Sequence, residues 1–156
     1  MSKLGRYSAD RKKITALTAA TKTVAVSECG TVFTLAGATT GVSAIAVTLP
    51  NASSAGSGWW CKFILLDNPR TNDYTISATA GDGDNMYAAT MYASGNAATI
   101  EGGSSVPSTA GSGSAYDVIT INKNVAVPGD QIEVLSDGSN WFVTSLTYAF
   151  NAVTLA

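Results

Sequence analysis

Short runs of β-forming residues, each closed by a turn, follow one another along most of this chain. From residue 23 onward they recur about every ten residues, separated by Gly, Ser, Asn and Pro. Strands at this spacing are typical of sandwiches and barrels, whereas βαβ units place a helical pattern between strands. The runs cover residues 23–26, 31–35, 44–49, 59–66, 74–78, 99–101, 116–122, 131–135 and 141–148.

The fold class follows from these runs and from the turns between them. We expect an all-β fold, a jelly-roll-like antiparallel β-sandwich formed by residues 23–156. Val-Pro-Gly-Asp at 127–130 predicts a tight turn, and Ser-Asp-Gly-Ser-Asn at 136–140 predicts a hairpin turn. Residues 67–72 are interpreted as a hairpin loop. Short helices at 10–22 and 88–98 are alternatives, weakened by Thr in the first and Gly95 in the second.

Composition excludes several classes of protein. The 156 residues suit one domain, nearly half are Ala, Thr, Ser or Gly, and only 13% are charged. The net charge of −2 argues against disorder. There is no His, which removes His-based zinc sites and Ser-His-Asp triads. No apolar run could span a membrane and none follows the basic N-terminus, so we expect neither a membrane segment nor a Sec-type signal peptide.

Charge is unevenly placed along the chain. Residues 1–22 carry six basic side chains and one acidic one, whereas residues 23–156 carry three basic and ten acidic ones. A +5 arm on a −7 body predicts an extended segment that seeks a partner; the alternative is a solvated leader. A protein partner is favoured over nucleic acid, because the body would repel phosphates and the arm has Tyr7 as its one aromatic residue.

Candidate catalytic and metal-binding groups are few. Asp82, Asp84 and Asn85 form the best cation candidate, yet they lack the later Glu of an EF-hand loop, so a plain turn is favoured. Asp67 and Asp73 flank a loop and could form the carboxylate pair of a glycosidase, but Asp at strand ends usually caps a turn. No stretch matches a phosphate-binding or dinucleotide-binding loop. We therefore expect no enzyme activity, no metal and no cofactor.

Two residue types remain to be placed. Neighbouring Trp59 and Trp60 on one strand must point to opposite faces, so one belongs to the core and the other to a surface, either a protein interface or a sugar-binding groove. For Trp141 a core position is expected. Cys29 and Cys61 could form one bridge, but without an export signal we expect free thiols.

The order of motifs in the body resembles the small jelly-roll or sandwich domains of bacteriophage virion proteins, which include capsid decoration proteins, head fibres and tail-fibre modules. The matching segments are residues 30–35, 47–50, 55–64, 74–78 and 128–143. In the last of these, Gly-Asp opens a strand and Asp-Gly-Ser-Asn-Trp turns into the next. The similarity extends over residues 23–146.

This resemblance implies a non-enzymatic, usually trimeric part of a virion, assembled in the host cytoplasm. A short basic arm on one compact domain suits a decoration (cement) protein on the capsid exterior that binds the major capsid protein. The alternative is a tail-fibre or spike module that binds host glycans, although no long shaft is present; a carbohydrate-binding module of a secreted enzyme is disfavoured. The residues expected to contact the capsid are Lys3, Leu4, Arg6, Tyr7, Arg11, Lys12 and Lys13.

Overall fold

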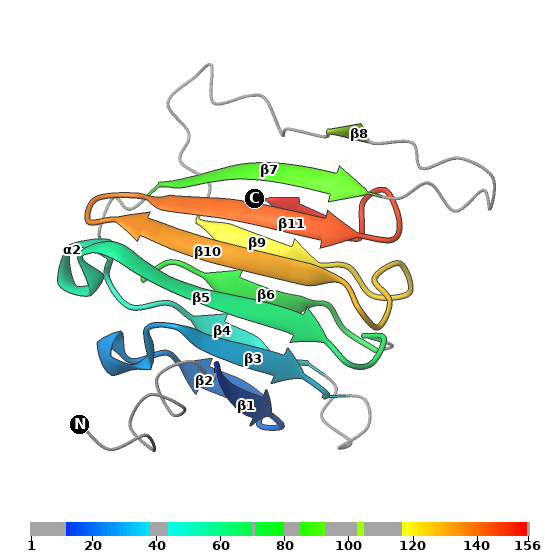
Figure 1. Ribbon diagram of the computed structural model, residues 1–156. Helices are drawn as coiled ribbons and strands as arrows, with labels where there is room; N and C mark the ends of the chain where they lie inside the picture. Colours follow the sequence, from blue (N-terminus) through cyan, green and yellow to red (C-terminus); the bar gives the residue numbers. More distant parts are fainter. Residues whose placement is uncertain are drawn as a thin grey trace, which may run out of the picture.

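Two β-sheets pack face to face in the computed structural model, which describes residues 12–37, 44–69, 71–79, 85–92, 103–104 and 117–155 (Figure 1). The seven-stranded sheet has the spatial order β1 (Lys13–Leu17), β3 (Thr31–Leu35), β5 (Ser57–Leu65), β10 (Gln131–Asp137), β11 (Trp141–Thr147), β7 (Met86–Tyr92), β8 (Gly103–Ser104). The five-stranded sheet has the order β12 (Val153–Leu155), β9 (Val118–Ile121), β6 (Tyr74–Ser77), β4 (Ala46–Thr48), β2 (Thr21–Thr23). The described helices are the short η1 (Val26–Glu28) and α2 (Ala52–Ala55). The predicted all-β sandwich is confirmed.

The first six strands of the chain alternate between the two sheets. Strands β1, β3 and β5 lie side by side in the larger sheet, and β2, β4 and β6 lie side by side in the smaller one. Each odd-numbered strand is followed by an even-numbered strand of the opposite sheet. Each return of the chain to a sheet adds a strand that is parallel to the previous strand of that sheet. The second half then reverses direction, and β10 and β9 run antiparallel to β5 and β6.

The expected jelly-roll-like antiparallel pairing is corrected by this winding. Of the ten strand pairings among the described residues, five are parallel: β1 with β3, β3 with β5, β2 with β4, β4 with β6, and β7 with β11. The loop at 67–72 is likewise a crossover between sheets and not a hairpin, since β5 and β6 lie in different sheets. Side chains alternate with period two in both kinds of sheet, so the sequence pattern does not distinguish them.

The boundary expected between arm and sandwich also shifts. Residues 1–22 were expected to lie outside the domain, but β1 pairs in register with β3 from Lys13 to Leu17, and β2 pairs with β4. Neither strand is helical. The Thr residues that weakened the helical alternative for this segment are favourable in strands, because β-branched side chains fit the pleated surface. Residues 1–11 lie outside the described residues.

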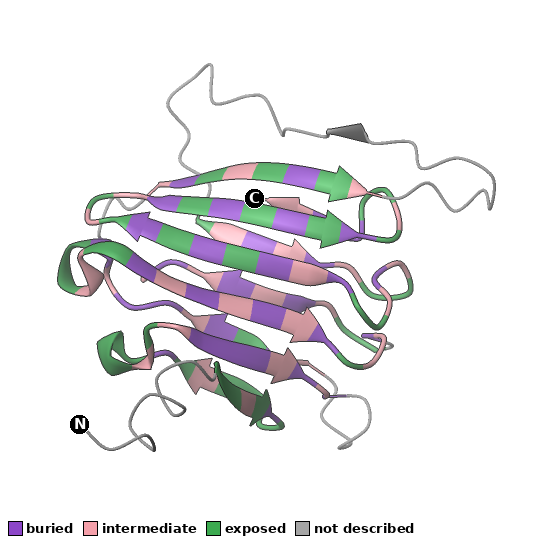
Figure 2. Cartoon of the chain, viewed as in Figure 1, coloured by how far each residue is buried: buried purple, intermediate pink, exposed green. Residues whose placement is uncertain are grey.

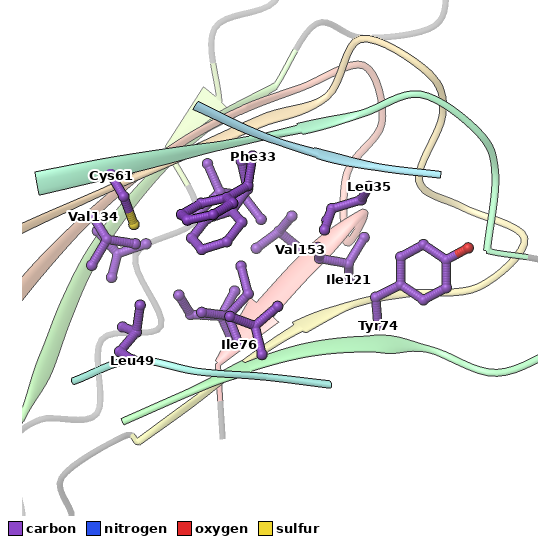
Figure 3. Packing of buried hydrophobic residues seen from close by; sticks show 14 of the residues in the cluster. Phe33, Leu35, Leu49, Cys61, Tyr74, Ile76, Ile121, Val134 and Val153 are labelled. Carbon is purple, nitrogen blue, oxygen red and sulfur yellow. The ribbon is translucent and has the colours of Figure 1, made fainter. Parts of the chain in front are cut away.

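Large apolar side chains from both sheets fill the space between the layers (Figure 3). The Phe33 and Phe63 rings stack with centroids 5.4 Å apart, on neighbouring strands β3 and β5. Trp141 is fully buried and meets the Trp59 ring edge-on at 5.5 Å. Buried and exposed residues alternate along most of β10 and along β11, and buried and intermediate residues alternate along most of β5, which Figure 2 shows as bands along the strands. One face of each strand therefore belongs to this core.

Two turns have the geometry that their sequences predict. At 127–130 the Asp130 amide donates to the Val127 carbonyl at 3.1 Å, and Gly129 has φ +99°, which favours glycine. At 136–140 Gly138 has φ +94° between the antiparallel strands β10 and β11. Both turn predictions are confirmed.

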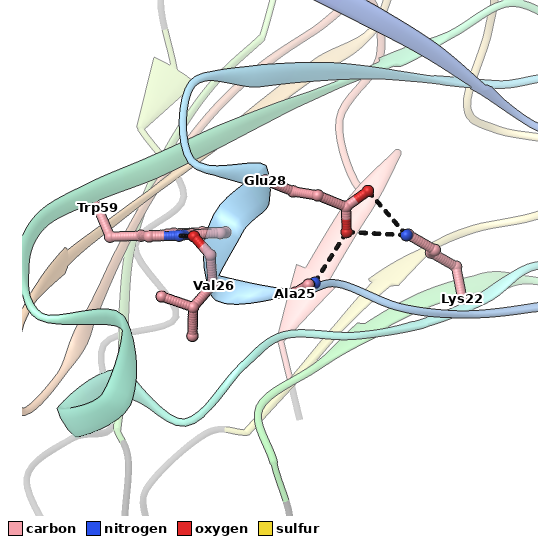
Figure 4. A network of polar contacts seen from close by, with 5 residues as sticks. All are labelled: Lys22, Ala25, Val26, Glu28 and Trp59. Atoms are coloured by element: carbon pink, nitrogen blue, oxygen red, sulfur yellow. Dashed lines mark hydrogen bonds and ion pairs between the residues drawn. The ribbon is translucent and has the colours of Figure 1, made fainter.

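A charged pair covers the β2 end of the core (Figure 4). Lys22 Nζ lies 2.8 Å from both carboxylate oxygens of Glu28 and 5.8 Å from the centroid of the Phe33 ring. Glu28 Oε2 also accepts a 2.8 Å hydrogen bond from the Ala25 amide, which holds the start of η1, and Trp59 Nε1 donates to the Val26 carbonyl at 2.8 Å. Burial by itself raises the pKa of Glu28, but the hydrogen bonds from Lys22 and Ala25 outweigh it and lower the pKa below its usual value.

We expect Glu28→Gln to lower the free energy of unfolding at neutral pH by about 1 kcal/mol, because the partly buried ion pair is lost. A carboxyl with a lowered folded-state pKa stabilises the fold above its unfolded pKa and loses that effect as the pH falls. The difference between native chain and variant should therefore shrink below pH 4.5, the ordinary value for Glu. Urea unfolding across pH measures it.

The matched control is the same substitution in a Lys22→Met background. If the ion pair is the cause, Glu28→Gln costs much less there than in the native chain. An equal cost in both backgrounds would contradict this role of the pair.

Candidate functional site

The residues expected to bind the capsid fall largely on the undescribed N-terminus. Lys3, Leu4, Arg6, Tyr7 and Arg11 lie outside the described residues. Lys12 and Lys13 are described and exposed, and Lys13 opens edge strand β1 opposite Thr31. The basic segment therefore enters the sandwich at the edge of the seven-stranded sheet.

Lys12 lies over the aromatic face of Trp60. Its Nζ is 5.4 Å from the ring centroid, within the range of a cation–π contact. Gly30 directly precedes β3, the strand between β1 and β5. Its amide donates to the Trp60 carbonyl at 2.8 Å, and its φ of +77° favours glycine. Trp59 is buried and Trp60 is only partly buried, so the prediction of opposite faces is confirmed. This contact joins the base of the basic segment to the outer face of the sheet.

Strand register extends that outer face into rows of side chains. The first row, which we call the aromatic row, runs across four strands, with neighbours in direct register. It consists of Trp60, Leu135, Phe142 and Tyr87. Tyr87 and Phe142 stack with centroids 5.8 Å apart. Directly opposed residues have Cβ atoms about 5 Å apart, so the aromatic row is a continuous strip.

Two further rows lie beside it, each displaced along the strands by two residues, or about 7 Å. The middle row consists of Lys62, Glu133, Thr144 and Ala89. The far row consists of Ile64, Gln131, Leu146 and Met91. The outer face thus has two mainly apolar rows on either side of a polar one that carries one charge of each sign.

The outer face of the five-stranded sheet is chemically different. Its rows are Thr154, Thr120, Thr75, Ala46 and Thr21, and beside them Val118, Ser77, Thr48 and Thr23. Hydroxyl side chains dominate, and neither row carries a charge or a large apolar residue other than Val118. The two outer faces therefore differ in what they can bind.

Sequence reasoning found Trp60 and Lys12 but missed the rest of this face. The available signal was the one used for Trp59 and Trp60: adjacent large apolar residues on one strand. Val134 precedes Leu135, and Trp141 precedes Phe142, so one member of each pair must point outward.

The carboxylates considered for catalysis hold turns. Asp67 Oδ1 accepts from the Tyr74 hydroxyl at 3.2 Å, and Asp73 Oδ1 accepts from the Lys123 amide at 2.7 Å. Asp82 and Asp84 lie outside the described residues, and Asn85 Nδ2 donates to Asn140 Oδ1 at 3.4 Å.

Within the described residues, no three His, Cys, Asp or Glu side chains gather closely enough for a metal ion.

A cavity of about 10 Å³ lies between the sheets, close to the minimum volume for a single water. Its lining residues are Leu35, Phe63, Leu65, Ile121, Asp130, Ile132 and Val153. A small-molecule ligand does not fit there.

Both cysteines are unbridged thiols in the structure, Cys29 exposed and Cys61 buried. Burial raises the pKa of Cys61 far above its usual value, and the nearby Cys29, Glu28 and Glu133 raise it further. Cys61 is therefore a poor nucleophile in the folded chain.

Comparisons with protein-family models, curated proteins and solved structures give no match for this chain. Among its described segments, no helix has the length and hydropathy needed to cross a membrane.

Proposed function

We propose that this chain is a non-enzymatic structural protein of a bacteriophage virion, a decoration protein that binds the major capsid protein lattice and stabilises the head as a homotrimer. The observation that carries the proposal is the +5 segment 1–22 on a −7 body. Its described base, Lys12, lies at a sheet edge beside the exposed aromatic row. The resemblance of residues 23–146 to jelly-roll and sandwich virion domains supports the same role.

In this proposal, Lys3, Arg6, Arg11, Lys12 and Lys13 bind acidic groups of the capsid, and Leu4 and Tyr7 add apolar contacts. A segment that orders only on binding loses conformational entropy, so one copy binds modestly. Three linked copies raise the effective concentration, and avidity adds about 10²-fold or more. Because the trimer binds the assembled lattice and not its separated subunits, it stabilises the shell by mass action.

The test is deletion of residues 2–11, which leaves Lys12 and all of β1 in place. Mixed with undecorated capsids, the truncated protein should lose affinity by about 10²-fold or more. For the full chain, occupancy should fall as salt screens the charges, with a salt-insensitive remainder removed by Leu4→Ser together with Tyr7→Ser. Co-sedimentation with capsids across a salt series measures both effects.

Lys123→Gln is the matched control, because it removes an exposed lysine of the body and should leave decoration unchanged. Unchanged occupancy of the deletion variant at every salt concentration would contradict the proposal and assign docking to the sandwich.

A second candidate is a fibre or spike module that binds host glycans, and the aromatic row favours it. Exposed rings in a strip offer stacking surfaces for sugars. Capsid binding separates the two functions, since a glycan-binding module has no affinity for the undecorated lattice.

A further inference from the structure

The outer face of the seven-stranded sheet is apolar where a solvated sheet face is normally polar. Five large apolar side chains on it are about half exposed: Tyr87 46%, Met91 57%, Leu135 43%, Phe142 43% and Leu146 54%. At roughly 100 Å² for each half-exposed side chain, they present about 500 Å² of apolar surface. This is near the upper end of what monomeric proteins leave exposed.

We infer that copies of this chain associate through this face, with the aromatic row and the far row at the contact. The inference rests on the homotrimer of the proposed function and names the surface through which its copies bind one another. A stable protein interface buries about 800 Å² on each partner. The two apolar rows with the polar middle row between them supply a surface of that order.

The charges on the face favour a second copy of this chain over a charged partner. Each body carries a net −7 over residues 23–156, so two bodies repel each other in general. In the rows of this face, however, the charged residues are Lys62 and Glu133, directly opposite each other on β5 and β10. Lys12, over Trp60 at the margin of the aromatic row, adds one positive charge. The contact surface therefore lacks the excess negative charge of the body, and its Lys62 can face Glu133 of another copy.

The contrast between the two outer faces favours a closed assembly. The hydroxyl rows of the five-stranded sheet offer no matching apolar surface, so association does not continue from one face to the other. Closed symmetry buries all copies of one patch together. In a trimer the β5 side of the face, with Trp60 and Ile64, packs on the β11 side of the next copy, with Phe142 and Leu146.

The experiment compares Leu146→Lys with Ala46→Lys, using the full chain and size-exclusion chromatography with light scattering at about micromolar concentration. Leu146 lies in the far row, and Ala46 is an exposed residue of the opposite outer face. The native chain and Ala46→Lys should elute at three chain masses. Leu146→Lys should elute at one, with the dissociation constant raised about 100-fold or more, because it places a charge in an apolar contact.

Far-UV circular dichroism checks that each variant is folded; if Leu146→Lys is not, Met91→Lys, on neighbouring β7, replaces it. A trimer that survives the folded variant, or a monomeric native chain, would overturn the inference. Retardation of a monomeric native chain in a hydroxyethylcellulose gel, abolished by Phe142→Ser, would assign the face to sugars instead. Capsid binding is measured separately. If the Leu146→Lys variant is monomeric and still decorates capsids as well as the native chain, the avidity of the proposed function is contradicted, but the interface inferred here is supported.

Discussion

Replacing Leu65 with Ala is expected to lower the free energy of unfolding by about 3–5 kcal/mol, a large part of the 5–15 kcal/mol typical of a domain. Leu65 is 2% exposed at the end of β5, where it packs beside Leu35 and lines the small inter-sheet cavity. Removing its side chain enlarges a void between two sheets that cannot collapse without breaking strand pairing. Urea unfolding at one fixed chain concentration measures the loss, because association also affects apparent stability.

The adjacent residue supplies the matched control. Leu66 is 53% exposed, and its backbone amide donates to the Leu35 carbonyl, a bond that Ala retains. Leu66→Ala should therefore change the free energy of unfolding by no more than about 0.5 kcal/mol. Similar losses at the two positions would contradict the assignment of Leu65 to the core.

Strands were predicted well in the interior of the seven-stranded sheet. Residues 31–35 match β3 in full, and the runs at 59–66, 131–135 and 141–148 match β5, β10 and β11 within two residues. The run at 23–26 is wrong: β2 ends at Thr23, and Val26 opens η1. The helix considered for residues 88–98 is wrong for residues 88–92, which belong to β7 and pair with β11. Residues 93–98 lie outside the described residues.

The path of the chain between the sheets could not be predicted from these patterns. Whether β3 pairs with β1 or with β4 depends on whether a loop crosses from one sheet to the other, and turn residues permit both. The same limit applied to the N-terminal boundary, since a strand such as β1, with Ile14 69% exposed, has little hydrophobic alternation to reveal it.

The candidate surface was predicted in part, through single residues. The Trp59 and Trp60 pair showed that one aromatic side chain faces outward, but a row across four strands depends on register between segments far apart in sequence. The contact of Lys12 with Trp60 is of the same kind, because it joins the residue before β1 to a residue of β5, far away in the sequence.

Asp130→Ala is expected to lower the free energy of unfolding by about 2–4 kcal/mol, because it leaves two backbone donors without their acceptor. Asp130 is 6% exposed, and its carboxylate accepts from the Val127 amide at 3.0 Å and from the Tyr148 amide at 2.8 Å. It thereby ties the turn before β10 to the segment after β11.

Asp137→Ala is the matched control. It also removes two backbone hydrogen bonds, from Ser139 and Asn140, but at an exposed turn where water replaces them, so it should lower the free energy of unfolding by less.

The two carboxylates should also respond to pH with opposite signs. Burial raises the pKa of Asp130, although hydrogen bonds from Val127 and Tyr148 oppose it, whereas hydrogen bonds from Asn140 and Ser139 lower the pKa of Asp137. When the pKa of a carboxyl is raised in the folded state, as for Asp130, its stabilising effect is present below the ordinary pKa of 3.8 and is lost as the pH rises through the folded-state pKa. When the pKa is lowered in the folded state, as for Asp137, the stabilising effect is present above 3.8 and is lost as the pH falls below it. Asp130→Asn should therefore cost more in acid than near neutrality, and Asp137→Asn should cost less in acid. Urea unfolding of both variants over this pH range measures the two slopes, and slopes of the same sign would contradict the raised pKa of Asp130.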